Sequence, residues 1–160
     1  MRYTLYLSVA TDDKRSVYSY TLTNFEKEIA SGTFVTKGKR RFDEVYCGHV
    51  AVQRALRRAA KVEGVIQLTI VLDHELVNTI GFELGNVNPS LYPTLCRTSQ
   101  RIMKRFAKCD LAAMELEDNM EPFEAATCDE ALDSLEYYRT VKGRWQLLKD
   151  TILGSKNIIR

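Results

Sequence analysis

The run VIQLTIVLD at 65–73 constrains the fold more than any other part of this chain. It is too short and too rich in β-branched residues to be a helix, so it predicts a buried strand that is entered through Gly64. The residues after it predict an amphipathic helix through Ile80. Asp73 therefore ends a buried strand and precedes a helix, a position that places a carboxylate at one edge of a sheet.

The segments before this strand predict three strands and a helix. RYTLYLSVA and YSYTLTNF alternate and are separated by turn formers, which indicates a β-hairpin, and EIASGTFVT supplies a third strand. From Asp43 to about Lys61 the apolar residues recur with helical spacing instead, so we expect a helix that packs on one face of the sheet and buries His49. The strand 65–73 should then pair in parallel with the first strand. The residues of the helical stripe are Val45, His49, Val52, Leu56 and Ala59.

The second half of the chain predicts further helices and a fifth strand. A helix is expected from near Ser90, with Pro93 in its first turn, and CDLAAMELE at 109–117 has the character of a strand. Thr127 with Glu130 forms a T-x-x-E capping box, which predicts a helix beginning at Cys128. Gly143 marks a joint before a last apolar segment.

Composition limits the functions open to the chain. The formal net charge is only +2, so any affinity for nucleic acid has to come from local basic clusters. The four cysteines are far apart in the sequence, with no CxxC or CxxH spacing, and no secretory signal follows Met1, which favours reduced thiols in a cytoplasmic protein. No apolar run approaches the roughly 20 residues that a membrane span needs, so no membrane partner is expected.

The order of elements and two short motifs resemble the ribonuclease H-like superfamily over about residues 3–135. LTIVLDHELVNTI is similar to the family's strand that ends in a catalytic aspartate, and CDEAL at 128–132 resembles the start of its last helix. The resemblance implies an α/β fold with a mixed five-stranded sheet, its first three strands antiparallel, flanked by helices. It implies Asp73 and Asp129 as catalytic acids, in a domain of residues 1–136 with a C-terminal helical extension at 137–160.

Two further acids of the family are replaced in this chain. Gly48 stands where the resemblance places a glutamate on the first helix, and Ser8 lies where an aspartate is expected on the first strand. Asp12 has the same strand parity as Ser8, and Glu44 lies one helical turn before Gly48. The family's reaction uses two Mg²⁺ ions about 4 Å apart, so loss of the bridging carboxylate should weaken both metal sites. We therefore expect no cofactor, or Mg²⁺ if the site is active, with Asp12, Glu44, Asp73 and Asp129 as its ligands.

The acids have alternative interpretations that the sequence leaves open. Asp73 suits the N-cap of the helix that follows it, and Asp129 suits a helix first turn, where the helix dipole favours an acid. His74 follows Asp73 directly and is a candidate for proton transfer.

Two basic groups are candidates for binding nucleic acid. One is a connection between a strand and a helix, and the other is the polar face of the helix after Pro93, which in this fold can grip a duplex backbone. The alternative in both cases is a solvated charged surface. The candidate residues are Lys37, Lys39, Arg40 and Arg41 in the connection, and Arg97, Arg101, Lys104 and Arg105 on the helix.

The extension at 137–160 carries more apolar side chains than a compact ribonuclease H core needs. They predict either packing across the open edge of the sheet or an interface with a second copy or another protein. Trp145, Leu148 and Ile152 are the candidate interface residues.

Two hypotheses about function follow. The first is a degenerate ribonuclease H-like protein that acts by binding, most simply by regulating or inhibiting a protein partner. The second is a divergent Mg²⁺-dependent nuclease acting on an RNA–DNA hybrid or another nucleic acid.

Overall fold

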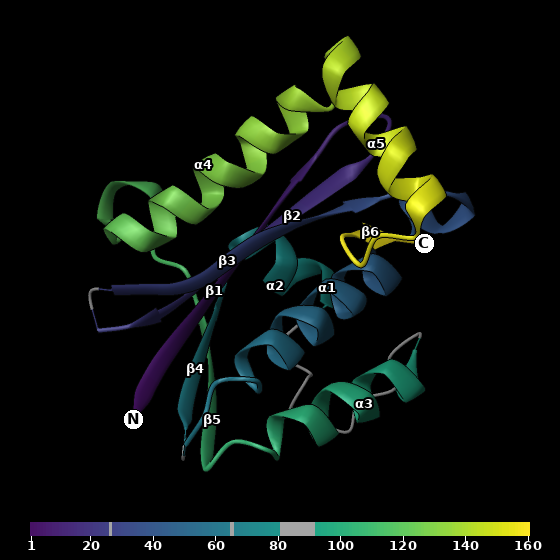
Figure 1. Ribbon diagram of the computed structural model, residues 1–160. Coiled ribbons are helices and arrows are strands. Elements are labelled where there is room, and N and C mark those ends of the chain that lie inside the picture. The colour runs from purple at the N-terminus through teal and green to yellow at the C-terminus, as the bar shows by residue number, and fades with distance from the viewer. Residues whose placement is uncertain (26, 65, 81–91) are drawn as a thin grey trace.

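The strands of the chain form a single mixed sheet with helices on both faces, as a computed structural model of residues 1–25, 27–64, 66–80 and 92–160 shows (Figure 1). The strand order is β5-β4-β1-β2-β3-β6. The strands are β1 (Arg2–Thr11), β2 (Ser16–Asn24), β3 (Lys27–Thr36), β4 (Gln67–Leu72), β5 (Lys108–Ala113) and β6 (Ile158–Ile159). The helices are α1 (Glu44–Ala59), α2 (His74–Ile80), α3 (Pro93–Met103), α4 (Pro122–Tyr137) and α5 (Val141–Leu153), with short 3-10 turns η1 (Lys39–Phe42) and η3 (Glu117–Asn119).

The pairing of the first four strands confirms the expected topology. β1, β2 and β3 form an antiparallel meander, and β4 lies parallel to β1 with Leu7 opposite Leu72. β5 continues the sheet in parallel beside β4. The fold is therefore the α/β, ribonuclease H-like arrangement that the sequence predicts, and a sixth strand of two residues is added at the β3 edge.

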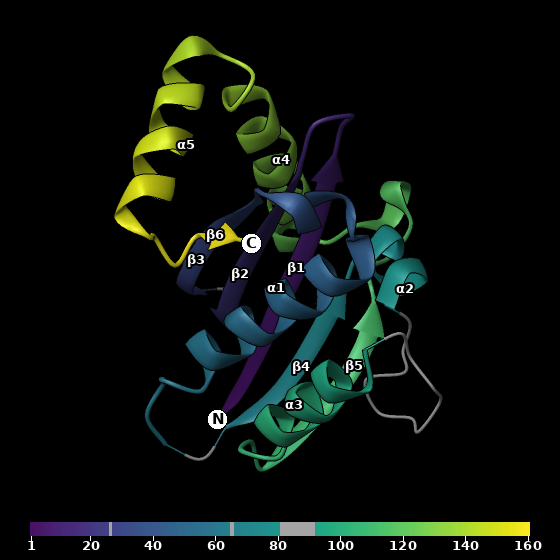
Figure 2. The same ribbon diagram turned by 90° about the vertical axis from the view of Figure 1, so that its right-hand side faces the viewer.

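Alternation along β1 divides the interior into two layers. Leu5 and Leu7 belong to the large core beneath α1, whereas Tyr6 and Ala10 belong to smaller clusters beneath α4. α1, α2 and α3 cover one face of the sheet and α4 covers the other (Figures 1 and 2). Ser8 shares the α4 face with Tyr6 and Ala10 and is also buried.

α1 follows the predicted stripe closely. Asp43 caps it by accepting a hydrogen bond from the Tyr46 N–H, and Ala51, Ala55 and Leu56 are buried against the sheet. His49 is 1% exposed, which confirms that it lies in the core.

The predicted start of the last long helix is wrong. α4 begins at Pro122, six residues before Cys128, because proline fits the first helical turn, where its missing N–H costs nothing. Thr127 is a buried residue inside the helix and donates its hydroxyl to the Phe123 carbonyl, one turn earlier. The T-x-x-E pattern therefore marks no cap here.

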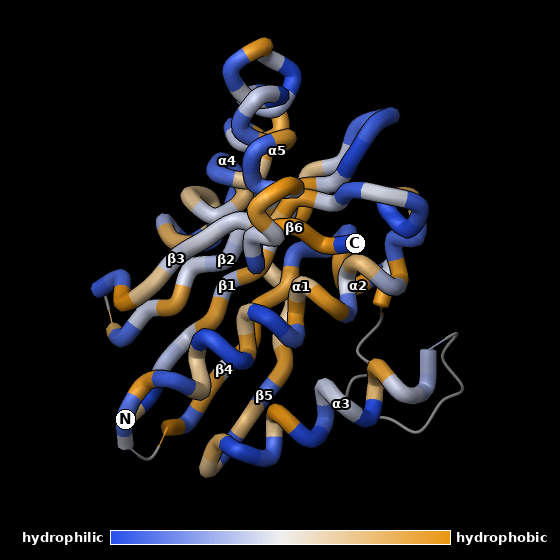
Figure 3. The backbone as a smooth tube through the Cα atoms, turned by 45° about the vertical axis from the view of Figure 1, so that its right-hand side comes forward, coloured by the Kyte–Doolittle hydropathy of each residue, from blue (hydrophilic) through white to orange (hydrophobic). Residues whose placement is uncertain are grey.

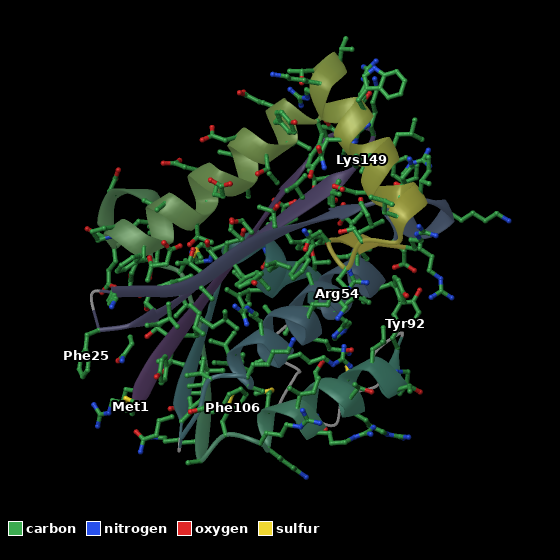
Figure 4. The ribbon with its side chains drawn as sticks, viewed as in Figure 1. Met1, Phe25, Arg54, Tyr92, Phe106 and Lys149 are labelled. Carbon is green, nitrogen blue, oxygen red and sulfur yellow. The ribbon has the colours of Figure 1, made fainter. Side chains whose placement is uncertain are left out.

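The extension after α4 turns back onto the sheet. Arg139 forms an ion pair with Asp12 at 3.1 Å, and Arg15 donates to the Tyr138 carbonyl at 2.9 Å, so two arginines join the β1–β2 turn to the α4–α5 junction. Arg54 of α1 donates to the carbonyls of Lys156 and Ile158, at 2.6 Å each, and holds the chain that leads into β6. Arg54 lies beneath this segment in Figure 4.

Gly143 lies in the first turn of α5, at the predicted joint. A Cβ added there would collide with the Tyr137 carbonyl oxygen and carbon, so the sharp turn from α4 into α5 requires glycine. Thr140 caps α5 by accepting from the Gly143 N–H at 3.0 Å. Among the residues that the structure describes, no helix has the length and apolar character that crossing a membrane requires.

Candidate functional site at the ends of β1 and β4

Asp73 lies where β4 meets α2, and its carboxylate is held by three hydrogen bonds. Oδ1 accepts from the Leu76 N–H at 2.8 Å, which caps α2. Oδ2 accepts from the Ser8 hydroxyl at 2.6 Å and from the Val9 N–H at 2.7 Å. A carboxylate has about four acceptor positions, and three of them are used here inside the protein. Asp73 is only 8% exposed.

Ser8 lies where the resemblance places the acid of the first strand, and Cys128 is the residue of α4 that contacts it. Ser8 Oγ lies 3.3 Å from Cys128 Sγ, and that sulfur lies 3.7 Å from the thioether of Met114 at the end of β5. Burial raises the pKa of the Cys128 thiol, the hydrogen bond with Ser8 lowers it, and the charges of Asp73, Asp129 and Glu124 raise it, so the net shift is upward. An upward shift keeps the thiol protonated at neutral pH, which makes it a weak nucleophile.

Gly48 marks the place where the resemblance expects the bridging glutamate. A Cβ added at Gly48 would lie 2.8 Å from Ile80 Cγ2 and 3.6 Å from Leu76 Cδ2. α2 therefore packs directly on this glycine, and its apolar side chains occupy the space that a glutamate side chain needs.

Asp129 and Asp12 have surroundings that differ from those of Asp73. Asp129 is exposed on α4, whereas its neighbour Cys128 faces Ser8. Asp12 lies in the β1–β2 turn, four residues or about 13 Å along the strand from Ser8. Burial raises the pKa of Asp12, but the N–H groups of Lys14 and Arg15 and the guanidinium of Arg139 lower it more, so the net shift is downward. Asp12 is thus part of a structural network at the hairpin.

Glu44 stands in the first turn of α1, close enough to influence the same acidic region electrostatically. The pKa of Glu75 is raised, first by burial and then by the charges of Asp73 and Glu44. His74, the candidate for proton transfer, is an exposed first residue of α2. Glu75 was not among the candidate site residues, although its position two residues after Asp73 could have suggested it.

Glu124 is a buried acid that the sequence interpretation also missed. It lies in the first turn of α4, is 5% exposed, and accepts from the Glu115 N–H at 3.3 Å. Pro122 was the available signal, because a helix that starts there places Glu124 in its first turn, where acids are favoured.

The acids near Asp73 do not fit a two-magnesium site. In the described part of the chain, no three His, Cys, Asp or Glu side chains are grouped in a way that could hold a metal ion. Magnesium needs several oxygen ligands with free lone pairs in near-octahedral geometry, and Asp73 has one such position left. The four-carboxylate set of Asp12, Glu44, Asp73 and Asp129 is not assembled.

The two basic groups lie in different surroundings. Lys37 and Arg41 line a cavity of about 480 Å³ together with three cations from the β1–β2 turn and α5, whereas Arg40 stacks on the Tyr46 ring at 4.3 Å. This cavity, here called the basic pocket, is lined by Lys14, Arg15, Lys37, Arg41 and Arg144, with Thr36 and Leu147. Arg97, Arg101, Lys104 and Arg105 are exposed on and just after α3, and Lys39 is exposed on η1.

Charge is strongly segregated along the chain, although the net charge is small. Residues 109–138, which span β5 to α4, contain ten of the 21 acidic residues and no lysine or arginine. Residues 97–108 contain five basic residues and no acid. In Figure 3, hydrophilic residues alternate with hydrophobic residues along α3, and the tip of the β1–β2 hairpin is hydrophilic.

The candidate interface residues are exposed. Trp145 is 66%, Leu148 42% and Ile152 75% exposed on α5, whereas Leu147 on the opposite side of the helix is buried against the sheet. They belong to the surface of α5 that faces away from the domain.

Comparison with known proteins identifies the fold by structure alone. No protein-family model matches the sequence, and no curated protein is significantly similar to it. Among solved structures, ribonuclease H1 from the archaeon Halobacterium salinarum superposes with a TM-score of 0.58 at 19% identity, covering 83% of this chain and 98% of that one. The N-terminal ribonuclease H domain of Rv2228c from Mycobacterium tuberculosis gives 0.58 at 11% identity, covering 87% and 99%. LC11-RNase H1, solved in complex with an RNA/DNA hybrid, gives 0.54 at 15% identity, covering 83% and 98%.

Proposed function

We propose that this ribonuclease H-like protein acts by binding, as a regulator or inhibitor of a protein partner, and does not use two-metal hydrolysis. The observation that carries the proposal is the state of Asp73. Its carboxylate receives hydrogen bonds from Ser8, Val9 and Leu76, so it joins β1 to α2 and caps a helix.

Two neighbouring substitutions support the same conclusion. An acid at position 8 would repel the carboxylate of Asp73, whereas Ser8 donates a hydrogen bond to it. The absence of a side chain at Gly48 leaves room for Ile80 where the resemblance places a bridging acid. Two-metal hydrolysis needs carboxylates that hold both ions on either side of the reacting phosphate. These residues supply packing and helix capping in that place instead.

The exposed apolar side chains of α5 support a protein partner. Apolar side chains gathered on one surface are typical of an interaction site, and aromatic residues such as Trp145 often anchor one. The identity of the partner and the cytoplasmic location remain predictions.

Calorimetry and a cleavage assay on the same samples test the proposal. Mg²⁺ or Mn²⁺ titrated into the wild-type protein should give no site-specific binding heat, and a labelled RNA–DNA hybrid should stay intact. Metal binding and cleavage that both disappear in Asp73→Asn would establish the divergent nuclease instead.

Nucleic-acid binding without cleavage is a second candidate, favoured by the basic pocket. Five cations from three separate segments line one cavity, and an extended phosphate backbone would neutralise them. Fluorescence anisotropy with a labelled hybrid, repeated at several salt concentrations, distinguishes the two. Lys37→Glu with Arg41→Glu should weaken such binding and flatten its salt dependence, and the exposed Lys27→Glu serves as the matched control.

A further inference from the structure

The outer surface of α5 carries a narrow apolar strip with coiled-coil spacing. Val141, Trp145, Leu148 and Ile152 are separated by four, three and four residues, so they lie on one line along the helix. Their exposed fractions are 72%, 66%, 42% and 75%. We call these four residues the α5 seam.

The seam is not needed for docking α5 onto the domain. Gly143 and Leu147 are the buried residues of α5, and they lie on the opposite side of the helix. A shallow groove of about 600 Å³ runs along the outer surface, with Tyr137 and Leu153 extending its apolar lining. The seam therefore remains available for a partner.

The charges beside the seam are all positive. Lys142 and Lys149 lie on one side of it and Arg144 on the other, and all three are exposed. Within the described residues, none of the three forms an ion pair, since the ion pairs found there are Arg139–Asp12 and Lys108–Asp110. Lys149 projects from α5 in Figure 4.

This charge pattern disfavours pairing of the seam with itself. In an antiparallel helix pair, each flanking position meets its own equivalent, so lysine would face lysine and arginine would face arginine. A parallel pair would place Lys142 and Lys149 opposite Arg144.

We propose that the α5 seam binds an amphipathic helix of a partner protein whose apolar residues are flanked by aspartate or glutamate. Apolar burial along the seam supplies the affinity, and the three cations select acidic flanks. This inference rests on the proposed protein-binding function and defines the chemistry of the partner.

The only tryptophan in the chain lies on the seam, so its fluorescence reports occupancy directly. The probe is a synthetic tryptophan-free peptide of three heptads with leucine at the seam positions and glutamate at the flanking positions, and the control peptide has lysine at those flanks. The acidic peptide should shift Trp145 emission to the blue with saturation, and the lysine peptide should not.

Variants of the full chain test the two parts of the proposal separately. Ile152→Asn should weaken the acidic peptide at least tenfold, and Lys142→Glu with Lys149→Glu should weaken it about tenfold and create binding of the lysine peptide. Lys27→Glu, at an exposed position of β3, is the matched control and should leave both unchanged. All of these positions are exposed, and circular dichroism verifies that the variants are folded.

Three results would overturn the proposal. The first is the absence of a spectral shift with millimolar acidic peptide. The second is a shift that depends only on protein concentration, which would report a second copy of the chain. The third is a shift produced by vesicles of phosphatidylcholine with phosphatidylglycerol but not by the peptide. The hydrolysis assay is independent of these readings, so cleavage of a hybrid would reject the binding function itself, whereas failure of the peptide alone rejects only the partner class.

Discussion

Asp73 is held by three hydrogen bonds that come from two elements of the fold, β1 and α2. A carboxylate at the end of β4 suits both a metal ligand and a helix cap, and the sequence could not distinguish the two roles. The distinction depends on residues 65 and 64 positions away, because Ser8 and Val9 of β1 donate to the same oxygen. Only the parallel pairing of β1 with β4 brings them together.

Asp73→Asn should lower the free energy of unfolding by about 1–3 kcal/mol, because the new amide N–H₂ cannot accept from Ser8 and Val9 while its oxygen caps α2. Urea denaturation followed by circular dichroism measures the change. Asp129→Asn, at an exposed position, should stay within about 0.5 kcal/mol of wild type. Equal stabilities of the two variants would contradict the capping role.

His49 should make the stability depend on pH. Burial lowers the pKa of His49 in the folded protein below its ordinary value of 6.5, and Nδ1 has no hydrogen-bond partner in the described structure. As the pH falls below about 6.5, the unfolded chain therefore binds a proton that the folded chain does not, and stability decreases until the folded pKa is reached. Urea midpoints measured from pH 7.5 to pH 5 should fall less in His49→Leu than in wild type, and parallel curves would rule this origin out.

At the scale of elements, α1 and α2 pack together at Gly48, where any side chain on α1 would collide with Ile80 of α2. The helical stripe of α1 was predictable from spacing, but the consequence of Gly48 was not, because the partner is Ile80 on the next helix. The start of α4 was misread for a related reason. Thr127 is a polar residue that satisfies its hydroxyl inside a helix and against Thr21 of β2, and this contact is not visible in a local pattern.

Gly48→Ala tests that contact. Alanine in place of glycine inside a helix normally stabilises by about 1 kcal/mol, but here the added methyl group would lie 2.8 Å from Ile80 Cγ2. We expect a net loss of about 1–2 kcal/mol. In the Ile80→Ala background, which lacks the Ile80 methyl group that the new side chain meets, Gly48→Ala should cost less stability than it does in the wild type. An equal cost in both backgrounds would argue against direct contact.

Removal of residues 155–160 tests whether β6 is part of the domain. Ile158 and Ile159 are 3% and 0% exposed, and burial of each is worth about 1.5–3 kcal/mol. The shortened chain should lose at least about 3 kcal/mol of stability, measured by denaturant unfolding. Arg160→Ala, which leaves β6 in place, is the milder comparison, and a shortened chain as stable as this variant would show that β6 is dispensable.

At the scale of the whole molecule, sequence periodicity predicted the first four strands with their pairing and the fifth as a strand, whereas the place of β5 beside β4 came from the structure. The sixth strand was not predicted, because a two-residue strand has no periodicity and depends on Arg54 and the edge of β3. The acids of 109–138 lie on β5, α4 and the segment between them, whereas the basic α3 covers the face of the sheet opposite α4 (Figures 1 and 2). The two functional possibilities, a basic pocket and the α5 seam, both involve the C-terminal extension, since Arg144 lines the pocket and Trp145 lies on the seam.

We propose that Asp73 and its hydrogen-bonding neighbours form a structural network and do not hold two metal ions. The most direct test measures cleavage of a labelled RNA–DNA hybrid by the wild-type protein in Mg²⁺ and in Mn²⁺, with Asp73→Asn examined in parallel. We expect no cleavage by either protein and a lower unfolding midpoint in the variant. Metal-dependent cleavage by wild type that Asp73→Asn abolishes, with folding intact, would contradict it.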